Sequence, residues 1–286
     1  MLVECTEVIW LAAFAATAPT IASAALSDWR TREVSDLHWA VIGVAGTILF
    51  LTYSVAEEGL KWEFFSLALG SALILADILL DKDLEQRLLY PAMAVAFSVP
   101  LYSLHSDALF SAWLSVPVCY LLYLAMYYAG ILKGGADAKC LIVLSMMFPM
   151  FPEMLGFPWI GVDDRIAMIF VPSISIMFFA SVAILPLGAA MAATNALRGD
   201  FDRRMFIGYR MDAALAASAS VWPTEDAVDG AVVRARPSDE PEEAVRRLIE
   251  AGAEKIWVTP MIPFIVPLAA VSLALLVLGS PLFLIL

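Results

Sequence analysis

The stretch Lys133-Gly134-Gly135-Ala136-Asp137-Ala138-Lys139 lies between two long apolar runs and places an aspartate at the head of the second run. A carboxylate at the head of a membrane helix is energetically unfavourable, so its presence predicts a function for Asp137. Glycine has no side chain, and Gly134 and Gly135 are therefore expected to let another backbone segment come close. A second carboxylate, a membrane and a substrate are expected to be arranged around Asp137.

The composition is that of a membrane protein. The chain has 286 residues, 62% of them hydrophobic, and a mean hydropathy of +0.83, whereas soluble globular proteins are nearer half apolar. Several apolar runs reach the length of about 18 residues that spans a bilayer. These runs indicate an all-α polytopic membrane protein with about eight transmembrane helices, at residues 8–26, 38–55, 63–80, 88–104, 108–131, 138–152, 166–193 and 261–286.

Prolines and the N-terminal composition refine this prediction. Pro149 and Pro152 are expected to end or bend the sixth helix early, and Pro172 and Pro186 to kink the seventh.

Residues 22–24 resemble a signal-peptide cleavage site. However, the apolar run 8–26 is longer than a usual signal core, and acidic residues precede it. A retained first helix is therefore expected.

The chain is expected to have three parts. Residues 1–194 would carry the first seven helices and both aspartates, residues 195–258 a small cytoplasmic α+β domain, and residues 259–286 the eighth helix. Within the polar part, Ala231-Val232-Val233 and Ile256-Trp257-Val258 indicate short strands. Residues 241–251 indicate an amphipathic helix, with Val245, Leu248 and Ile249 on one side.

Charge and reactive residues exclude several functions. The net charge of −12 argues against nucleic-acid binding. The chain has two histidines, His38 and His105, which argues against a His-based metal site and against a His-activated nucleophile. No cofactor is expected. Cys119 and Cys140 are expected to be small core residues.

The acidic side chains of residues 225–254 form either a solvated surface or a field that attracts a basic peptide.

The loop charges predict the orientation. With the N-terminus outside and eight spans, every lysine and arginine except Lys61 and Arg165 falls on the cytoplasmic side. Asp28 then lies at the cytoplasmic end of the first helix and Asp137 at the cytoplasmic start of the sixth. Two carboxylates at one membrane depth can hydrolyse a peptide bond. The ionised one takes a proton from water while its protonated partner donates to the scissile carbonyl.

Simpler roles compete with this interpretation. Asp137 could be the N-cap of its helix and Asp36 that of the second helix, while Asp77 could cap or snorkel at the end of the third. Glu33 and Asp36 could instead orient Asp28 or bind substrate. Arg30, Arg32, Lys133 and Lys139 are most simply topology determinants, with a minor role in tuning the nearby carboxylates.

Four segments together resemble the archaeal preflagellin peptidases, which belong with the type IV prepilin peptidases among the GxGD membrane aspartyl proteases. They are Asp28 with its basic continuation through Val34, Gly134 to Lys139, Met205 to Arg210, and Ile256 to Phe264. The resemblance covers most of the chain except roughly residues 63–105.

The resemblance implies a membrane endopeptidase of the cell membrane whose active site faces the cytoplasm. Such enzymes remove the short basic leader, a class III signal peptide, from archaellin and type IV pilin-like precursors. It also implies that Asp28 and Asp137 are catalytic, with Gly134, Gly135 and Lys139 in the supporting motif. Which aspartate is the acid and which the base is not assigned.

The chain departs from this family in three respects. Ala136 stands where the Gly-x-Gly-Asp pattern has its second glycine. The eight expected spans exceed the six usual in archaeal members by one helical pair between the aspartates. The CxxC-bearing domain of bacterial prepilin peptidases is missing, so no methyltransferase activity and no S-adenosylmethionine are expected.

Two other functions remain as alternatives. A presenilin-like or signal-peptide-peptidase-like intramembrane protease would carry a Tyr-Asp pair and a Pro-Ala-Leu motif, neither of which this chain has at the expected place. A small proton- or cation-coupled transporter would need polar residues at mid-span, where Asp77 is the one marginal candidate.

Overall fold

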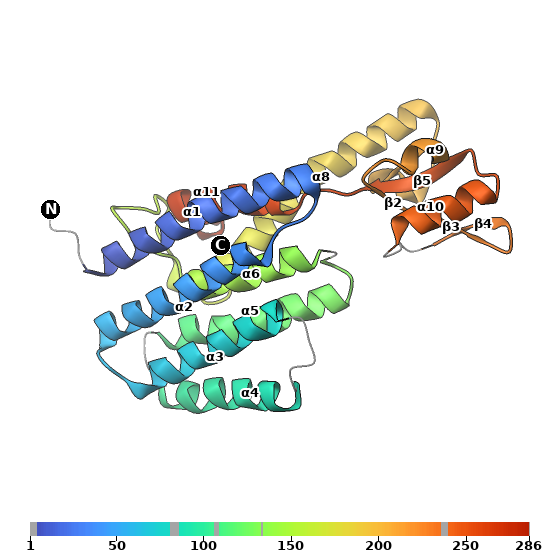
Figure 1. The fold of residues 1–286 in the computed structure, drawn as a ribbon. Coiled ribbons are helices and arrows are strands. Elements are labelled where there is room, and N and C mark those ends of the chain that lie inside the picture. Colours follow the sequence, from blue (N-terminus) through green and yellow to red (C-terminus); the bar gives the residue numbers. More distant parts are fainter. Residues whose placement is uncertain (1–4, 81–85, 106–108, 133, 236–239, 286) are drawn as a thin grey trace. The chain divides into compact units, whose positions relative to one another are not determined.

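The computed structural model describes residues 5–80, 86–105, 109–132, 134–235 and 240–285. It is mostly helical, with small β-sheets in the C-terminal region (Figure 1). The chain divides into two compact units. The first comprises Met1–Ala180 and Pro263–Leu286, and the second comprises Ser181–Ile262. Lys82, Lys133 and Asp239 lie outside the described residues.

Each of the eight apolar runs contains a helix. The helices are α1 (Cys5–Thr31), α2 (Asp36–Glu58), α3 (Trp62–Leu79), α4 (Gln86–Ser103), α5 (Phe110–Tyr128), α6 (Gly135–Met147), α8 (Pro172–Arg198) and α11 (Ile265–Leu278), with the short α7 (Asp164–Ala167) and α12 (Leu282–Ile285). Among the described residues, five helices are long and apolar enough to cross a membrane, namely α1, α2, α3, α5 and α8. In the other three runs, the apolar stretches Leu88–Ser103 of α4 and Ile265–Leu278 of α11 are shorter, and α6 has 13 residues.

The outer faces of the long helices are apolar, as expected for contact with lipid. On α2, Val41, Val44 and Ile48 are all exposed and recur at helical spacing. Exposed apolar side chains at such spacing form a continuous surface that water would solvate poorly. This surface and the helix lengths together identify a membrane protein.

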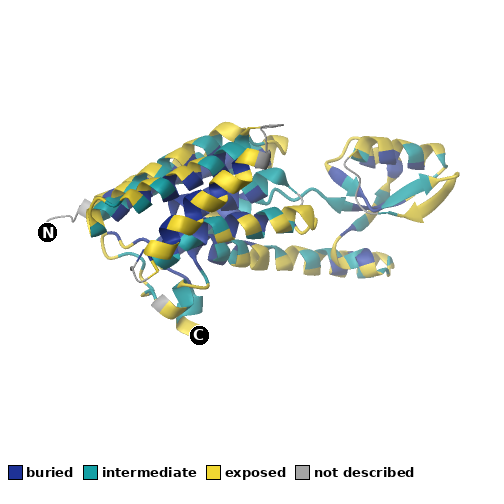
Figure 2. Cartoon of the chain, turned by 90° about the horizontal axis from the view of Figure 1, so that it is seen from below, coloured by how far each residue is buried: buried dark blue, intermediate teal, exposed yellow. Residues whose placement is uncertain are grey.

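Helix α6 lies in the core of the first unit. Its residues from Cys140 to Met147 are all buried, as expected for a helix that is apolar on every side. It packs against α2, α5 and α11, and buried residues fill the interior of this bundle (Figure 2). Cys119 and Cys140 are both fully buried, which confirms the expectation that they are core residues.

The prolines act differently in the two helices. Helix α6 ends at Met147, two residues before Pro149, in agreement with the expected early end. Pro172 is the first residue of α8 and does not kink it, because a proline at the first helical position lacks only an N–H that would have no partner there. The expected kink at Pro172 is therefore wrong, whereas Pro186 does lie inside the helix.

The second unit contains two antiparallel sheets. Strands β1 (Tyr209–Asp212), β5 (Lys255–Pro260) and β2 (Val221–Pro223) form one sheet in the order β1-β5-β2, and β3 (Glu225–Val228) pairs with β4 (Ala231–Arg234). The unit also contains the short helices η1 (Arg203–Phe206), α9 (Ala213–Ala216) and α10 (Pro241–Glu250), and the part of α8 from Ser181 on. The two expected strands and the amphipathic helix are confirmed. Val245 and Leu248 are buried, but Ile249 is 43% exposed, so its expected inward position is wrong.

Two arginines neutralise part of the acidic segment from within. Arg204 donates to Asp202 at 2.9 Å and to Glu225 at 2.8 Å, and its guanidinium lies 4.8 Å from the centre of the Trp257 ring. Arg247 donates to Asp226 at 2.7 Å. The hydrogen bonds from Arg204 lower the pKa of Asp202 to about 2, and Arg247 holds the pKa of Asp226 below its ordinary value. Glu225 and Asp226 are thus internal partners as well as surface charges.

Candidate active site

The two predicted aspartates lie at the same end of the first unit. Asp28 is in the last turn of α1, and Asp137 is in the first turn of α6. In Figure 1 the C-terminal end of α1 and the start of α6 lie on the same side of this unit. The charge of Asp28 acts directly on the Asp137 carboxyl group. The fold therefore brings together two carboxylates that are far apart in the sequence.

Asp28 is held by a backbone amide from the opposite end of the chain. Its side chain is buried, with 9% exposed, and its Oδ2 accepts a hydrogen bond from the N–H of Ile265 at 3.1 Å. Ile265 is the first residue of α11, and N–H groups in the first turn of a helix have no partner within the helix. Asp28 supplies that partner and is fixed by it.

The end of α1 brings a positive charge to Asp28. The N–H of Arg32 donates to the carbonyl oxygen of Asp28 at 3.1 Å, and the Arg32 charge acts on the Asp28 carboxyl group. Arg32 has a φ of 61°, a left-handed conformation that is unfavourable for a residue with a side chain. A residue in this conformation directly after a helix is a common helix end, and its N–H satisfies one of the last carbonyl groups of α1.

Asp137 is the third residue of α6 and bonds back to the residue that caps the helix. Gly134 is the N-cap, and the Asp137 carboxylate accepts a hydrogen bond from its backbone N–H. The expected N-cap role of Asp137 itself is therefore wrong. Its actual position is that of the acidic residue in a capping box, which reaches back to the cap. Capping and electrostatic contact with Asp28 coexist in this side chain.

Gly134 and Gly135 differ in which atoms occupy the space where a side chain would begin. A Cβ atom on Gly134 would lie 2.6 Å from Asp137 Oδ2, so the glycine makes room for that carboxylate. Of the atoms in the described part of the chain, a Cβ atom on Gly135 would meet only the Tyr127 side chain, at 3.9 Å. Among the described residues, the atoms nearest to these two positions are side-chain atoms of Asp137 and Tyr127, so a close approach of another backbone segment is not seen at either glycine.

Helices α2 and α11 position the aspartate-bearing helices, since each of them packs against both α1 and α6. At the start of α2, Lys139 Nζ donates to both carboxylate oxygens of Asp36, at 2.7 and 2.9 Å. Ser35 is the N-cap of α2, so the expected cap role of Asp36 is wrong. The Glu33 side chain is exposed. The backbone carbonyl oxygen of Glu33 accepts a hydrogen bond from the Ser27 hydroxyl group.

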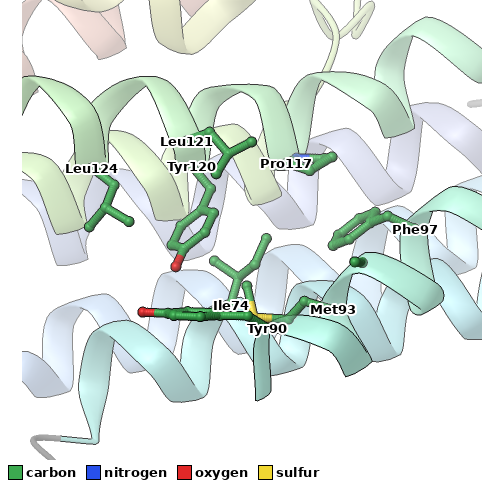
Figure 3. A pocket seen from close by; sticks show the side chains of 9 residues that line it. Ile74, Tyr90, Met93, Phe97, Pro117, Tyr120, Leu121 and Leu124 are labelled. Carbon is green, nitrogen blue, oxygen red and sulfur yellow. The ribbon is translucent and has the colours of Figure 1, made fainter. Parts of the chain in front are cut away.

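Asp77 belongs to a different part of the bundle. Its Oδ2 accepts a hydrogen bond from the Tyr120 hydroxyl at 2.6 Å, so it is tied to α5, unlike the capping or snorkelling side chain expected. Beside this pair, an apolar groove of about 350 Å³ lies between α3, α4 and α5. Figure 3 shows Tyr120 pointing from α5 toward Tyr90 of α4, with Met93, Phe97 and Leu124 along the groove. None of these three helices carries Asp28 or Asp137.

One histidine contacts a hydroxyl group. His38 Nε2 lies 3.2 Å from Ser23 Oγ, and its Nδ1 lies 3.0 Å from the carbonyl oxygen of Ser35. The two nitrogens thus link α1 to α2 and to the cap of α2. A neutral carbonyl oxygen stabilises the imidazolium that a nucleophile mechanism forms less than a carboxylate does. The contact is therefore best explained as a helix-to-helix bond.

Comparisons with protein-family models, with curated proteins and with solved structures give no match to this chain. The chemistry of the site follows from its own residues. When two carboxyl groups act on each other, the state in which they share one proton is more stable than the state in which both are negatively charged. Such a pair can activate water and protonate a carbonyl in the same step. The role of the Ile265 N–H was missed from the sequence because a backbone donor has no residue-type signature.

Proposed function

We propose that the chain is an integral membrane aspartyl endopeptidase. It removes the class III signal peptide from archaellin or type IV pilin-like precursors at the cytoplasmic face of the cell membrane. Asp28 and Asp137 are the catalytic pair, and neither a metal nor another cofactor takes part. The observation that carries the proposal is that the end of α1 and the start of α6 lie on the same side of the first unit, where the charge of Asp28 acts on the Asp137 carboxyl group.

The proposal includes an eight-span arrangement with the N-terminus outside. In this arrangement α4, α6 and α11 would cross the membrane together with the five membrane-length helices. Lys61 follows α2 and Arg165 lies in α7. These are the two basic residues that the charge bias leaves outside. The carboxylates would then lie at the membrane–cytosol boundary, where water is available for hydrolysis.

The reaction needs one ionised and one protonated carboxyl group. The ionised group takes a proton from a water molecule as that water attacks the scissile carbonyl carbon. The protonated group gives its proton to the carbonyl oxygen, which would otherwise carry a negative charge. As the tetrahedral intermediate collapses, the carboxyl group that took the proton from water gives it to the leaving nitrogen, and the other carboxylate recovers its proton from a hydroxyl of the intermediate. The C–N bond breaks, the leader leaves with the new carboxyl group, and the mature protein leaves with the new amino group.

The substrate would be an apolar segment preceded by a basic leader. A leader of this charge suits an enzyme with a net charge of −12. Asp229, Glu242, Glu243, Glu250 and Glu254 of the second unit are acidic residues that such a leader would meet.

The test is cleavage of a precursor by the purified protein in liposomes. A precursor with its basic leader should give a product whose new N-terminus, determined by sequencing, lies just before the apolar segment. The matched control is the same precursor with the leader lysines and arginines replaced by glutamine, which should be cleaved much more slowly. Intact precursor under all conditions, with folded enzyme, would refute the proposed function.

A further inference from the structure

The groove between α3, α4 and α5 is apolar along its length and polar at one end. Its wall on α4 contains Tyr90, Met93 and Phe97, and its wall on α5 contains Pro117 and Tyr120. Spacings of three and four residues place each set on one face of its helix. In Figure 3 the hydroxyl groups of Tyr90 and Tyr120 lie toward one end of the groove, and Phe97 and Pro117 lie at the other.

Helix α4 is attached to α3 on the side away from the groove opening. Ser66 Oγ of α3 donates to the carbonyl oxygen of Ala96 at 3.1 Å. A Cβ atom on Gly70 would lie 2.6 Å from the Phe97 ring, so the glycine lets the two helices come close. Ile74 of α3 is fully buried and lines the groove from below. The packing of α4 on α3 therefore defines the groove.

The polar end of the groove also holds a carboxyl group. Asp77 Oδ2 accepts the hydrogen bond from the Tyr120 hydroxyl at 2.6 Å, and in the part of the chain that the structure describes Oδ1 accepts none. Asp77 lies two residues before the end of α3 at Leu79. Since α3 is long enough to cross a membrane, this end of the groove lies near the membrane boundary, where lipid head groups are found.

The size of the groove fits a single hydrocarbon chain. Its volume is about 350 Å³, within the range of about 300–1,000 Å³ that is usual for sites that bind small molecules. A membrane-spanning helix, about 10 Å wide and 30 Å long, occupies roughly 2,000 Å³. The groove is therefore too small for a transmembrane helix of another protein.

We propose that this groove binds one membrane lipid whose head group carries an ammonium group. One hydrocarbon chain lies along Met93 and Phe97, and the ammonium group meets the Asp77 carboxylate. A carboxylate attracts a positively charged group and repels a negatively charged one. The hydroxyl groups of Tyr90 and Tyr120 offer further hydrogen bonds to the head group at the same end.

This site goes beyond the proposed function. Helices α3 and α4 lie in residues 63–105, to which the family resemblance does not extend, apart from the first residue of α3. Neither they nor α5 carries Asp28 or Asp137. Lipid binding would give this additional helical pair a role. It is measured without any cleavage, so either proposal can fail while the other stands.

The test is retention of lipid by the purified full chain in detergent, measured by native mass spectrometry. The probes are phosphatidylethanolamine, which has an ammonium group, and phosphatidylglycerol with the same chains, which has none. At equal concentrations the protein should retain phosphatidylethanolamine about fivefold more, as expected for one added contact between opposite charges. Equal retention of the two lipids, or retention of neither, would overturn the proposal.

Two alanines of α4 provide a matched pair of variants. Ala94 lines the groove, whereas Ala92 is exposed on the same helix and is not part of its lining. Ala94→Phe should lower retention of phosphatidylethanolamine about tenfold or more, because about ten lost contacts between heavy atoms are enough for this effect. Ala92→Phe should retain the lipid as the original protein does. Equal retention by the two variants would refute the groove as the site.

Asp77→Asn tests the head group without filling the groove. The asparagine oxygen can still accept the hydrogen bond from Tyr120, so the variant removes the charge and keeps this contact. The preference for phosphatidylethanolamine over phosphatidylglycerol should disappear. A preference that survives would overturn the role of Asp77. Cys119 and Cys140 are buried, so their resistance to thiol reagents verifies that each variant is folded.

Discussion

The Asp137 carboxylate occupies the space where a side chain at position 134 would begin, since a Cβ atom on Gly134 would lie 2.6 Å from Asp137 Oδ2. The φ of Gly134 is −91°, which any residue can adopt. The glycine is therefore required for space and not for its backbone freedom. The site depends on one missing side chain next to one of its carboxylates.

Gly134→Ala is expected to displace the Asp137 carboxylate and to lower kcat about tenfold or more. Gly135→Ala is the matched control, because its Cβ atom has ordinary contact distance to Tyr127 and alanine favours the helix. Steady-state cleavage rates of the two variants measure the difference. Equal rates would show that the space at residue 134 does not matter.

The sequence was informative about the positions of the carboxylates and less so about their surroundings. The apolar runs predicted a helix at each of eight places, because helices in a bilayer need long apolar segments. The Asp28–Ile265 bond was not predictable, since it joins a side chain to a backbone amide 237 residues away. The cap of α2 was misassigned to Asp36 because Ser35 and Asp36 are adjacent and both suit an N-cap.

The ion pair between Lys139 and Asp36 is expected to contribute little. The two side chains are 28% and 49% exposed, and exposed pairs are typically worth at most about 1 kcal/mol. Lys139→Ala should therefore keep the cleavage rate within about fivefold, and exchange of the two charges in Lys139→Asp/Asp36→Lys should restore it. A loss as large as that of an Asp137 variant would assign Lys139 a direct role in the reaction.

Arg204 is expected to stabilise the second unit strongly. It is 9% exposed and bonded to two carboxylates, and removal of one partner from a buried ion pair costs about 3 kcal/mol or more. Arg204→Met should lower the protection of the β5 amides against hydrogen exchange by a corresponding amount. Arg246→Met is the control, because its side chain is 67% exposed and lies 3.9 Å from Glu250. Equal protection in both variants would contradict this role.

The second unit should lose stability in acid. The pKa of Asp202 is about 2 in the folded chain, whereas it is 3.8 for an aspartate without partners. The pKa of Asp226 is also lowered in the folded chain. A lowered pKa adds stability above pH 3.8, and that stability is lost as the pH falls toward about 2. Pepsin digestion of the full chain at steps from pH 4 to pH 2 should show cleavage between residues 200 and 260 increasing, after correction with an unfolded substrate. Unchanged resistance would refute the assignment.

The most direct test of the central claim is the cleavage rate of the Asp28→Asn and Asp137→Asn variants on a leader-bearing precursor in liposomes. Each variant should lose at least about a thousandfold in rate, and the double variant should be no slower than either, because the two carboxylates act as a unit. Asp77→Asn, an aspartate of the same bundle outside the pair, should cleave at nearly the original rate. Full activity in Asp28→Asn or in Asp137→Asn would contradict the account.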